Sequence, residues 1–510
     1  MEPRGLSHRR FVRLALATPL LVGIRASSGA AQASNSGLRP EGGSAEPVAA
    51  PAPEASLASR LATLLGSRVR NGTWGAMVVS LTNGDTLFAR NAGTSLNPAS
   101  TLKLYTTALA FEQLGPGHRF TTDVLRDGAL LEDGTLAGNL VLRGGGDPAL
   151  SRRWFGGDGD APMRALARQV VSAGVRRVRG DVVGDEGAFE HKLVPDGWLS
   201  RYLQASYAAR VSALSLNENL VHIVVTAGRA GHSGVVRLEP ASAALTVANS
   251  STTRAGSRGA RITVTGVDQG VIRVRGWIGA SSEPRVYVLV VPEPARFTAG
   301  AFARALADAG VQVSGRVRIG PTPVSAVQLA ALPSPTLAEL AAVMNRESIN
   351  HFAELIFRNA ARVTNPMGVG SAAMGNAILR DFLELRVGSS PQDVFAADGS
   401  GLSTLDRVTA RSMVKLLSYA HHAPWSRQFH ESLPVAGREE TLRMRMRRTP
   451  AQGNLHAKTG TTSDVVALSG YVSARTGEVL AFAFLYNGKD RWNARETIDA
   501  MGVSLAEFAR

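Results

Sequence analysis

The chain has 510 residues, of which 44% are hydrophobic, a formal net charge of +15 and no cysteine. This length predicts two or three domains, and the lack of cysteine excludes disulfides, thiolate metal sites and cysteine nucleophiles. Arginine supplies all but five of the 56 basic residues and is scattered along the chain, which argues against nucleic-acid binding.

The N-terminus has the three parts of an export signal. Basic residues between positions 4 and 13 precede an apolar run at 14–24 and an Ala-Gln-Ala sequence that ends at Ala33. The apolar run is too short to span a bilayer. Residues 7–13 also resemble a twin-arginine signal, so both the Sec and the twin-arginine routes stay open. We predict an export signal at residues 1–33, a periplasmic or other extracytoplasmic location, and no stable membrane span after cleavage.

A flexible linker follows the predicted signal. Residues 34–56 are mostly Ala, Pro, Glu, Gly and Ser and offer almost nothing to bury. The folded protein is expected to begin near Leu57 with a helix. Two strands at residues 74–81 and 86–89 then flank Asn83-Gly84, a sequence typical of a two-residue hairpin turn.

The next segment changes from helical to strand-rich character. Ser100 precedes apolar side chains at helical spacing that continue to Phe111, so we expect it to open a helix. From about Thr121 to Val291 the chain has short β-like runs separated by Asp-Gly and Gly-Gly turns. This pattern predicts separate β-rich structure in the middle of the chain.

Helical periodicity returns after the strand-rich segment, and the chain closes with strands. The expected elements are helices at 336–344, 351–363, 374–385 and 410–420, strands at 456–462, 465–472 and 479–486, and a terminal helix from about Arg491. We therefore predict an α+β domain, an antiparallel sheet flanked by helices, that is built from residues 57–117 and 333–510. Inserted β-rich structure at 118–332 splits it.

Three short motifs occur in an order that indicates serine acyl transfer: Ser100-x-x-Lys103, Ser348-x-Asn350 and the Lys-Thr-Gly-Thr run at 458–461. Ser100 and Lys103 lie on one helix face, so the lysine amine can accept the hydroxyl proton. We predict that Ser100 is the nucleophile and Lys103 its general base.

Proton transfer to Lys103 requires a neutral amine. Burial and a second cation, Lys458, are expected to disfavour its protonated form. Only five lysines exist in this arginine-rich chain, and two of them are in these motifs. These positions need an amine that can lose its proton, which a guanidinium cannot do. This contrast supports the assignment of both lysines as catalytic residues.

The other motif residues receive supporting roles. Ser348 can relay a proton to the leaving nitrogen and Asn350 can hold the substrate amide. We expect the strand residues Thr459, Gly460 and Thr461 to bind the peptide edge-on, with the backbone N–H groups of Ser100 and Thr461 as the oxyanion hole.

Two further matches to these motifs are interpreted as chance. Ser412-x-x-Lys415 lies inside a helix after the second motif, and Ser215-x-Asn217 lies in the strand-rich middle. The sequence contains no His-Glu-x-x-His, no Gly-x-Ser-x-Gly and no phosphate-binding Gly-x-x-x-x-Gly-Lys. We therefore expect neither a metal nor another cofactor.

Three further runs accompany these motifs: Gly-Gly-Gly-Asp-Pro at 144–148, residues 213–219, and Asp-Gly-Ser-Gly-Leu-Ser at 398–403. With all of them, the chain resembles a known family over about residues 57–510. This family comprises the D-alanyl-D-alanine carboxypeptidases/endopeptidases, the class C low-molecular-mass penicillin-binding proteins of the penicillin-binding protein 4 type. The resemblance implies a β-lactamase/transpeptidase-like domain split by two inserted β-rich domains, one nested in the other. A departure is Glu-Glu-Thr-Leu at 439–442, where the family often has Asp-Gly-Thr-Leu.

The resemblance also implies a function. The chain is expected to cleave peptidoglycan stem peptides as a D-Ala-D-Ala carboxypeptidase, an endopeptidase or both, and to bind β-lactam antibiotics. The family places an acidic residue of the insertion near the pocket for the free amine of the diamino acid. Asp185 is the candidate here, with an ordinary surface aspartate as the open alternative.

Two other functions remain as alternatives. A serine β-lactamase would need an efficient deacylating water, and no Glu-x-x-Leu-Asn run is evident to position one. A catalytically inactive wall-binding protein is disfavoured because every residue of the three motifs is present.

Overall fold

The computed structural model describes residues 56–510, apart from 68, 70 and 365–367. The predicted export signal and all but the last residue of the predicted linker lie outside these residues. The helices are α1 (Leu57–Ser67), α2 (Lys103–Leu114), α3 (Ala161–Ser172), α4 (Pro294–Asp308), α5 (Leu337–Glu347), α6 (Asn350–Arg362), α7 (Ala372–Phe382), α8 (Ala410–His422), α9 (Ser426–Ser432) and α10 (Arg491–Glu507).

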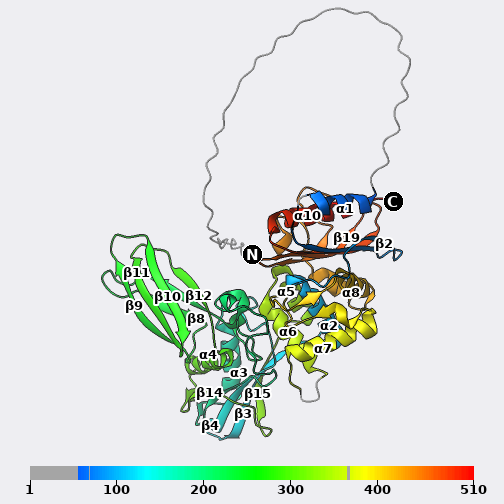
Figure 1. The fold of residues 1–510 in the computed structure, drawn as a ribbon. Helices are drawn as coiled ribbons and strands as arrows, with labels where there is room; N and C mark the ends of the chain where they lie inside the picture. Colours follow the sequence, from blue (N-terminus) through cyan, green and yellow to red (C-terminus); the bar gives the residue numbers. More distant parts are fainter. Residues whose placement is uncertain (1–55, 68, 70, 365–367) are drawn as a thin grey trace, which may run out of the picture. The chain divides into compact units, whose positions relative to one another are not determined.

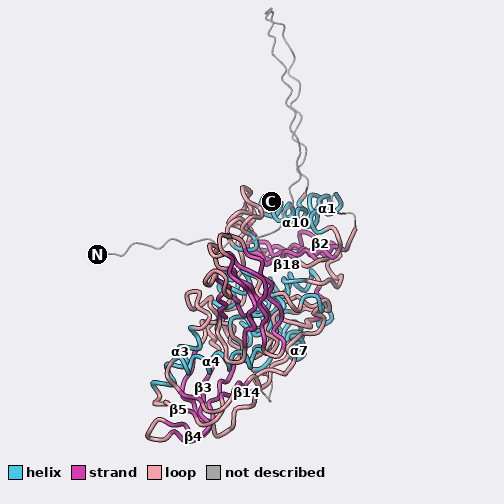
Figure 2. Tube along the Cα trace, turned by 90° about the vertical axis from the view of Figure 1, so that its left-hand side faces the viewer, coloured by secondary structure: helices cyan, strands magenta, loops and turns pink. Residues whose placement is uncertain are grey.

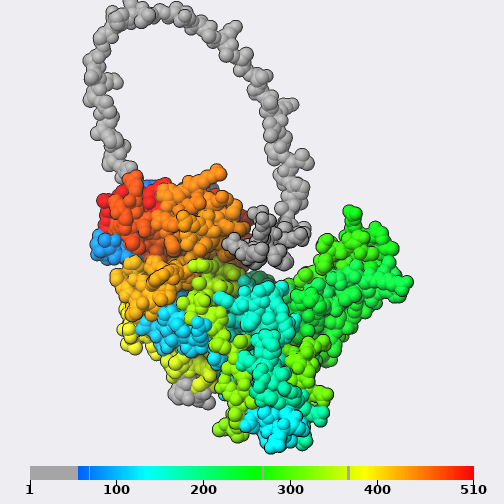
Figure 3. Space-filling model, turned by 180° about the vertical axis from the view of Figure 1, so that it is seen from behind, coloured from blue at the N-terminus to red at the C-terminus, as the bar shows by residue number. Residues whose placement is uncertain are grey.

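An antiparallel five-stranded sheet joins the two ends of the described chain in the order β18-β19-β20-β1-β2. Its strands are β1 (Thr73–Ser80), β2 (Thr86–Arg90), β18 (His456–Thr461), β19 (Val465–Ser473) and β20 (Val479–Asn487). The N-terminal hairpin therefore pairs with the three C-terminal strands, as the sequence predicted. The space-filling view in Figure 3 shows the same union, with N-terminal blue atoms beside C-terminal red and orange atoms.

Helices cover both faces of this sheet (Figure 1). Alternate residues of a strand point to opposite faces. Ala76 and Val78 accordingly pack in the core formed with α1 and α10, whereas Met77 and Val79 pack against the core that contains α2 and α8. Residues 103–111 of α2 are all buried, which fits a helix that is enclosed on every side.

The segment between α2 and α5 forms three further sheets. Its strands are β3 (Thr121–Leu130), β4 (Thr135–Gly144), β5 (Arg177–Val178), β6 (Val182–Asp185), β7 (Leu220–Thr226), β8 (Val235–Glu239), β9 (Thr246–Arg254), β10 (Ala260–Asp268), β11 (Val271–Gly279), β12 (Arg285–Val290), β13 (Gln312–Val313), β14 (Val317–Ile319) and β15 (Val327–Pro333). The first strand, β3, pairs antiparallel with the last, β15, so both ends of the insertion lie together. Two short strands, β16 (Val394–Phe395) and β17 (Arg407–Val408), pair elsewhere.

The insertion has an inner and an outer part in sequence. Strands β3–β6 and β13–β15 form a seven-stranded sheet, and β7–β12 interrupt its chain order with two three-stranded sheets. Figure 2 shows β3, β4, β5 and β14 with α3 and α4 in one part of the molecule. Helix α3 lies within the predicted strand-rich segment and α4 follows it directly, and neither helix was predicted. The exact boundaries 57–117, 118–332 and 333–510 stay a prediction.

The prediction of a two-residue hairpin turn is wrong. Strand β1 ends at Ser80 and β2 begins at Thr86, so five residues connect them. A type I′ turn needs a positive φ at both central residues, and here Gly84 has one (φ 82°) whereas Asn83 does not. A wider turn forms instead, in which Gly84 N–H donates to the Ser80 carbonyl oxygen.

Candidate active site

Ser100 lies in a short 3₁₀ turn, η1 (Ala99–Leu102), that leads into α2. Asn97 holds this turn because its Oδ1 accepts a hydrogen bond from Ala99 N at 2.9 Å. The same asparagine exchanges two hydrogen bonds with Asn487 at the end of β20, at 2.8 and 3.0 Å. Ala99 itself has a positive φ of 46°, a strained conformation typical of functional sites. Ser100, the predicted nucleophile, is thus fixed to the central sheet.

Lys103 Nζ lies 3.0 Å from Ser100 Oγ, as the i, i+3 spacing predicted. The lysine is fully buried, and its Nζ also lies 2.7 Å from Asn350 Oδ1 and 2.6 Å from the Ser400 carbonyl oxygen. Burial lowers the pKa of Lys103 from 10.5 to about 8, although nearby carboxylates oppose this shift. A substantial neutral fraction near neutral pH lets this amine act as a base.

Ser348 ends helix α5. The helix begins at a capping box formed by Thr336 and Glu339, and Ser348 terminates it in the left-handed conformation, with φ 61°. This turn directs Ser348 Oγ to Lys458 Nζ, 2.9 Å away. The second and third motifs therefore meet through one hydrogen bond.

Lys458 on β18 is also fully buried, and burial lowers its pKa well below the ordinary value. Its neighbour Lys103 lowers this pKa further. Repulsion between two ammonium groups acts on both, and the predicted effect of Lys458 on Lys103 stays a prediction. Burial alone accounts for the lowered pKa of Lys103.

Asn350 opens α6 and connects the site to the insertion. Its Oδ1 accepts from Lys103, and its Nδ2 donates to the Tyr207 carbonyl oxygen at 2.9 Å. Tyr207 lies in η3 (Ser206–Ala208) of the insertion. The Asn350 amide thus orients Lys103, the predicted general base. Its N–H group, which was expected to hold substrate, donates to the Tyr207 carbonyl oxygen in this structure.

Gly460 allows β18 to lie close to the nucleophile turn. A Cβ at this position would lie 2.6 Å from the Pro98 carbonyl oxygen, closer than real Cβ atoms come. Thr459 and Thr461, on either side, line a cavity that also contains Ser100. The close approach of β18 to the Pro98 carbonyl explains why residue 460 is a glycine. Contact with substrate is expected from Thr459 and Thr461.

The cavity at Ser100 has a volume of about 380 Å³. Its lining consists of Ser100, Ser348, Thr441, Arg445, Thr459, Thr461, Val466, Arg491, Trp492 and Arg495. Thr441 belongs to the Glu-Glu-Thr-Leu run and matches the family pattern, whereas the departing residues Glu439 and Glu440 are not among the lining residues. The three arginines and Trp492 were not predicted, because no motif marks them.

Asp185 is not among the residues that line the Ser100 cavity. It ends β6, is buried, and accepts hydrogen bonds from Gly187 N at 2.8 Å and from the backbone and hydroxyl of Thr322. It lines another cavity of about 770 Å³, together with Arg143 and Asn359. Recognition of an amine by Asp185 stays a prediction.

A loop next to Lys103 completes the surroundings of the base. Within the Asp-Gly-Ser-Gly-Leu-Ser run, Asp398 accepts hydrogen bonds from three backbone N–H groups of the loop and from Trp198 Nε1. Glu354 Oε1 accepts from Gly399 N at 2.9 Å, and burial raises the pKa of Glu354 to about 8. This loop presents the Ser400 carbonyl to Lys103. The sequence identified the run but assigned it no role.

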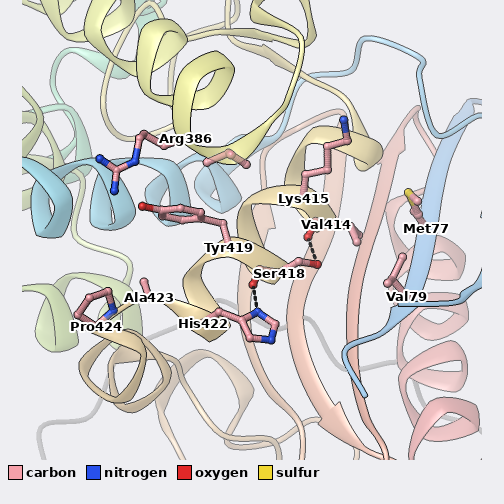
Figure 4. A pocket seen from close by; sticks show the side chains of 11 residues that line it. Met77, Val79, Arg386, Val414, Lys415, Ser418, Tyr419, His422, Ala423 and Pro424 are labelled. Carbon is pink, nitrogen blue, oxygen red and sulfur yellow. Dashed lines mark hydrogen bonds between the residues drawn. The ribbon is translucent and has the colours of Figure 1, made fainter. Parts of the chain in front are cut away.

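The two further motif matches, Ser412-x-x-Lys415 and Ser215-x-Asn217, form contacts away from the Ser100 cavity. Ser412 is buried and its Oγ lies 2.5 Å from Tyr105 Oη, while Lys415 Nζ donates to the Gly388 carbonyl oxygen. Figure 4 shows Lys415 on α8 at a separate hollow of about 630 Å³, where Ser412 is not a lining residue. Ser215 Oγ donates to the Ser212 carbonyl oxygen within the insertion.

The described residues contain neither a group of metal ligands nor a helix that could cross a membrane. No group of three or more His, Asp or Glu side chains among them is arranged to hold a metal ion. Within the same part of the chain, no helix combines the length and the apolar character that crossing a membrane requires.

The chain matches the D-Ala-D-Ala carboxypeptidase 3 (S13) family over residues 55–508. It belongs to this family. It is 34% identical over 450 residues to the D-alanyl-D-alanine carboxypeptidase of Actinomadura sp.. The aligned region covers 85% of this chain and 81% of the relative. It is also 26% identical to the D-alanyl-D-alanine carboxypeptidase DacB of Haemophilus influenzae, over 78% of this chain and 82% of the relative.

The fold agrees with that of a solved family member. The crystal structure of penicillin binding protein 4 (dacB) from Haemophilus influenzae matches with a TM-score of 0.71 and 22% identity, over 87% of this chain and 97% of that chain. The predicted fold class is confirmed, a transpeptidase-like domain with inserted β-rich structure. Family membership also confirms the predicted enzyme class, a serine-type, penicillin-binding D-Ala-D-Ala peptidase.

Proposed function

We propose that this enzyme is exported and forms an acyl-enzyme on Ser100 with peptidoglycan stem peptides that end in D-Ala-D-Ala, or with cross-linked stem peptides. The observation that carries the proposal is the 3.0 Å contact of Ser100 Oγ with a buried lysine amine whose pKa is about 8. An amine with these properties can deprotonate a serine hydroxyl near neutral pH.

The reaction begins when Ser100 Oγ attacks the carbonyl carbon of the penultimate D-Ala while its proton passes to Lys103 Nζ. The new C–O bond replaces the C–N bond, and the leaving nitrogen must gain a proton. We assign Ser348, which is hydrogen-bonded to Lys458, as the relay that carries the proton from Lys103 to this nitrogen. Lys103 is then neutral again and accepts a proton from the water that attacks the ester. The ester C–O bond breaks, this proton returns to Ser100 Oγ, and the shortened peptide leaves.

The Asn350 amide and the Ser400 carbonyl supply positioning. Both accept from Lys103, which keeps the amine directed at Ser100 Oγ. The N–H groups of Ser100 and Thr461 are proposed to stabilise the oxyanion, and each such donor contributes on the order of 10²-fold or more in rate.

An intact-mass time course of the purified protein with penicillin tests this proposal against its two alternatives. We expect a penicilloyl adduct that persists for many minutes, together with D-alanine release from a D-Ala-D-Ala peptide. Rapid disappearance of penicillin without a lasting adduct would indicate a β-lactamase. A protein without adduct, turnover or D-alanine release would be an inactive wall-binding protein.

Export rests on residues 1–33, which lie outside the described part of the chain. The test is to sequence the N-terminus of the protein recovered from the extracytoplasmic fraction. We expect cleavage near Ala33, whereas full-length protein in the cytoplasm would contradict export.

A further inference from the structure

One wall of the Ser100 cavity carries arginines that the reaction steps do not use. Arg491 and Arg495 lie one turn apart at the start of α10, and Arg445 reaches the same cavity from the loop before β18. Trp492 lies between the two helix arginines in sequence and is 74% exposed. This wall combines positive charge with an accessible aromatic ring.

The charges on this wall are unequally compensated. Arg445 binds Asp499, with its Nε at 2.8 Å and its Nη2 at 2.5 Å from the same carboxylate oxygen. Arg491 Nη1 instead donates to the Thr462 carbonyl oxygen at 3.1 Å. Among the described residues, no carboxylate forms an ion pair with Arg491 or Arg495. Two guanidinium groups without a carboxylate partner in the described part of the chain therefore line the cavity next to Ser100.

The arginine wall lies next to the end of β18, because Arg491 contacts the carbonyl of Thr462, the residue after Thr461. Asn350, which contacts Tyr207 of the insertion, does not line this cavity. Asn350 is expected to hold the substrate amide, so we place the acyl part of a substrate on its side. The leaving group then extends past Thr461 toward α10.

We propose that Arg491 and Arg495 form a subsite for leaving groups that carry more than one carboxylate. This inference rests on the proposed function. A single D-Ala leaves with one carboxylate, which the Thr459 and Thr461 hydroxyls can bind. A second stem peptide leaves with further carboxylates, and guanidinium groups bind carboxylates through paired hydrogen bonds. The subsite favours the cleavage of cross-linked peptides.

Two synthetic peptides with the same acyl part, one ending in D-Ala-D-Glu and the other in D-Ala-D-Gln, isolate the extra charge. We expect the parent enzyme to prefer the D-Glu peptide in kcat/KM by roughly 1.5-fold to fivefold at low salt, the range of an exposed ion pair. Added salt should reduce this preference by screening. Arg491→Gln and Arg495→Gln should each lower the ratio toward one, and Arg495→Lys should restore part of it.

Arg261→Gln is the matched control, because it removes an exposed arginine from β10 in the insertion. It should keep the parent ratio. Equal cleavage of both peptides by the parent enzyme, or an unchanged ratio in both α10 variants, would overturn the subsite. If the variants instead responded differently to a charge on the acyl part, the assignment of the subsite to the leaving group would be overturned. Failure of the proposed function is distinct, since the parent enzyme would then cleave neither peptide.

Discussion

Replacing Lys103 by arginine tests whether a neutral amine activates Ser100. A lysine with a pKa of about 8 is neutral for about a tenth of the time at pH 7. A guanidinium with a pKa above about 12 is neutral for roughly 10⁻⁵ of the time or less. The fraction of competent base therefore falls by roughly 10⁴-fold, and we expect acylation by penicillin to fall by a similar factor.

The assay is the second-order rate of penicillin acylation, followed by intact mass at several pH values. In the parent enzyme the neutral amine is the active form, so the rate should rise about tenfold per pH unit below the pKa and level off above about pH 8. Lys103→Arg should lose both the rate and this rise. Lys103→Met, which has no base but a similar length, should behave in the same way.

Lys415→Arg is the matched control, because this lysine lies outside the Ser100 cavity and contacts the Gly388 carbonyl. It should keep the parent rate and pH profile. Acylation of Lys103→Arg at the parent rate would refute the assignment of Lys103 as the base. A route through Ser348 and Lys458 would then be the better account.

Three other substitutions test separate parts of the site. Ser100→Ala should abolish penicillin labelling and peptide cleavage with an unchanged fold, and Ser412→Ala should leave both intact; labelling of the first variant would move the nucleophile. Asp185→Asn should weaken cleavage of peptides with a free side-chain amine more than of their acetylated forms, and equal loss would remove its recognition role. Gly460→Ala should cost about 1–3 kcal/mol in denaturant unfolding and slow acylation by displacing the strand. Gly66→Ala, where a Cβ meets no atom within 4 Å, should cause neither effect.

Local rules account for the features that the sequence predicted correctly. Helical spacing alone brings Lys103 to Ser100, and the 3.0 Å contact follows from it. Helix α5 begins at Leu337, one residue after its predicted start at Thr336. Short strand-like runs between turns predicted the strands of the central sheet, because these signals depend on near neighbours in the sequence.

Features that depend on distant packing could not be predicted. The Asn350–Tyr207 contact joins residues 143 positions apart, and no motif relates them. The arginine wall exists because α10 packs against β19, the strand next to β18, whereas periodicity shows only that a helix forms. The pKa values of the two lysines depend on burial from every side, so their size could not be predicted from the sequence.

Mapping the penicillin adduct tests the central claim most directly. The acylated protein is digested, and tandem mass spectrometry locates the added mass on one residue. We predict a single penicilloyl group, bound as an ester to Ser100. An adduct on Ser348, Ser412 or any other residue, with Ser100 unmodified, would contradict the account.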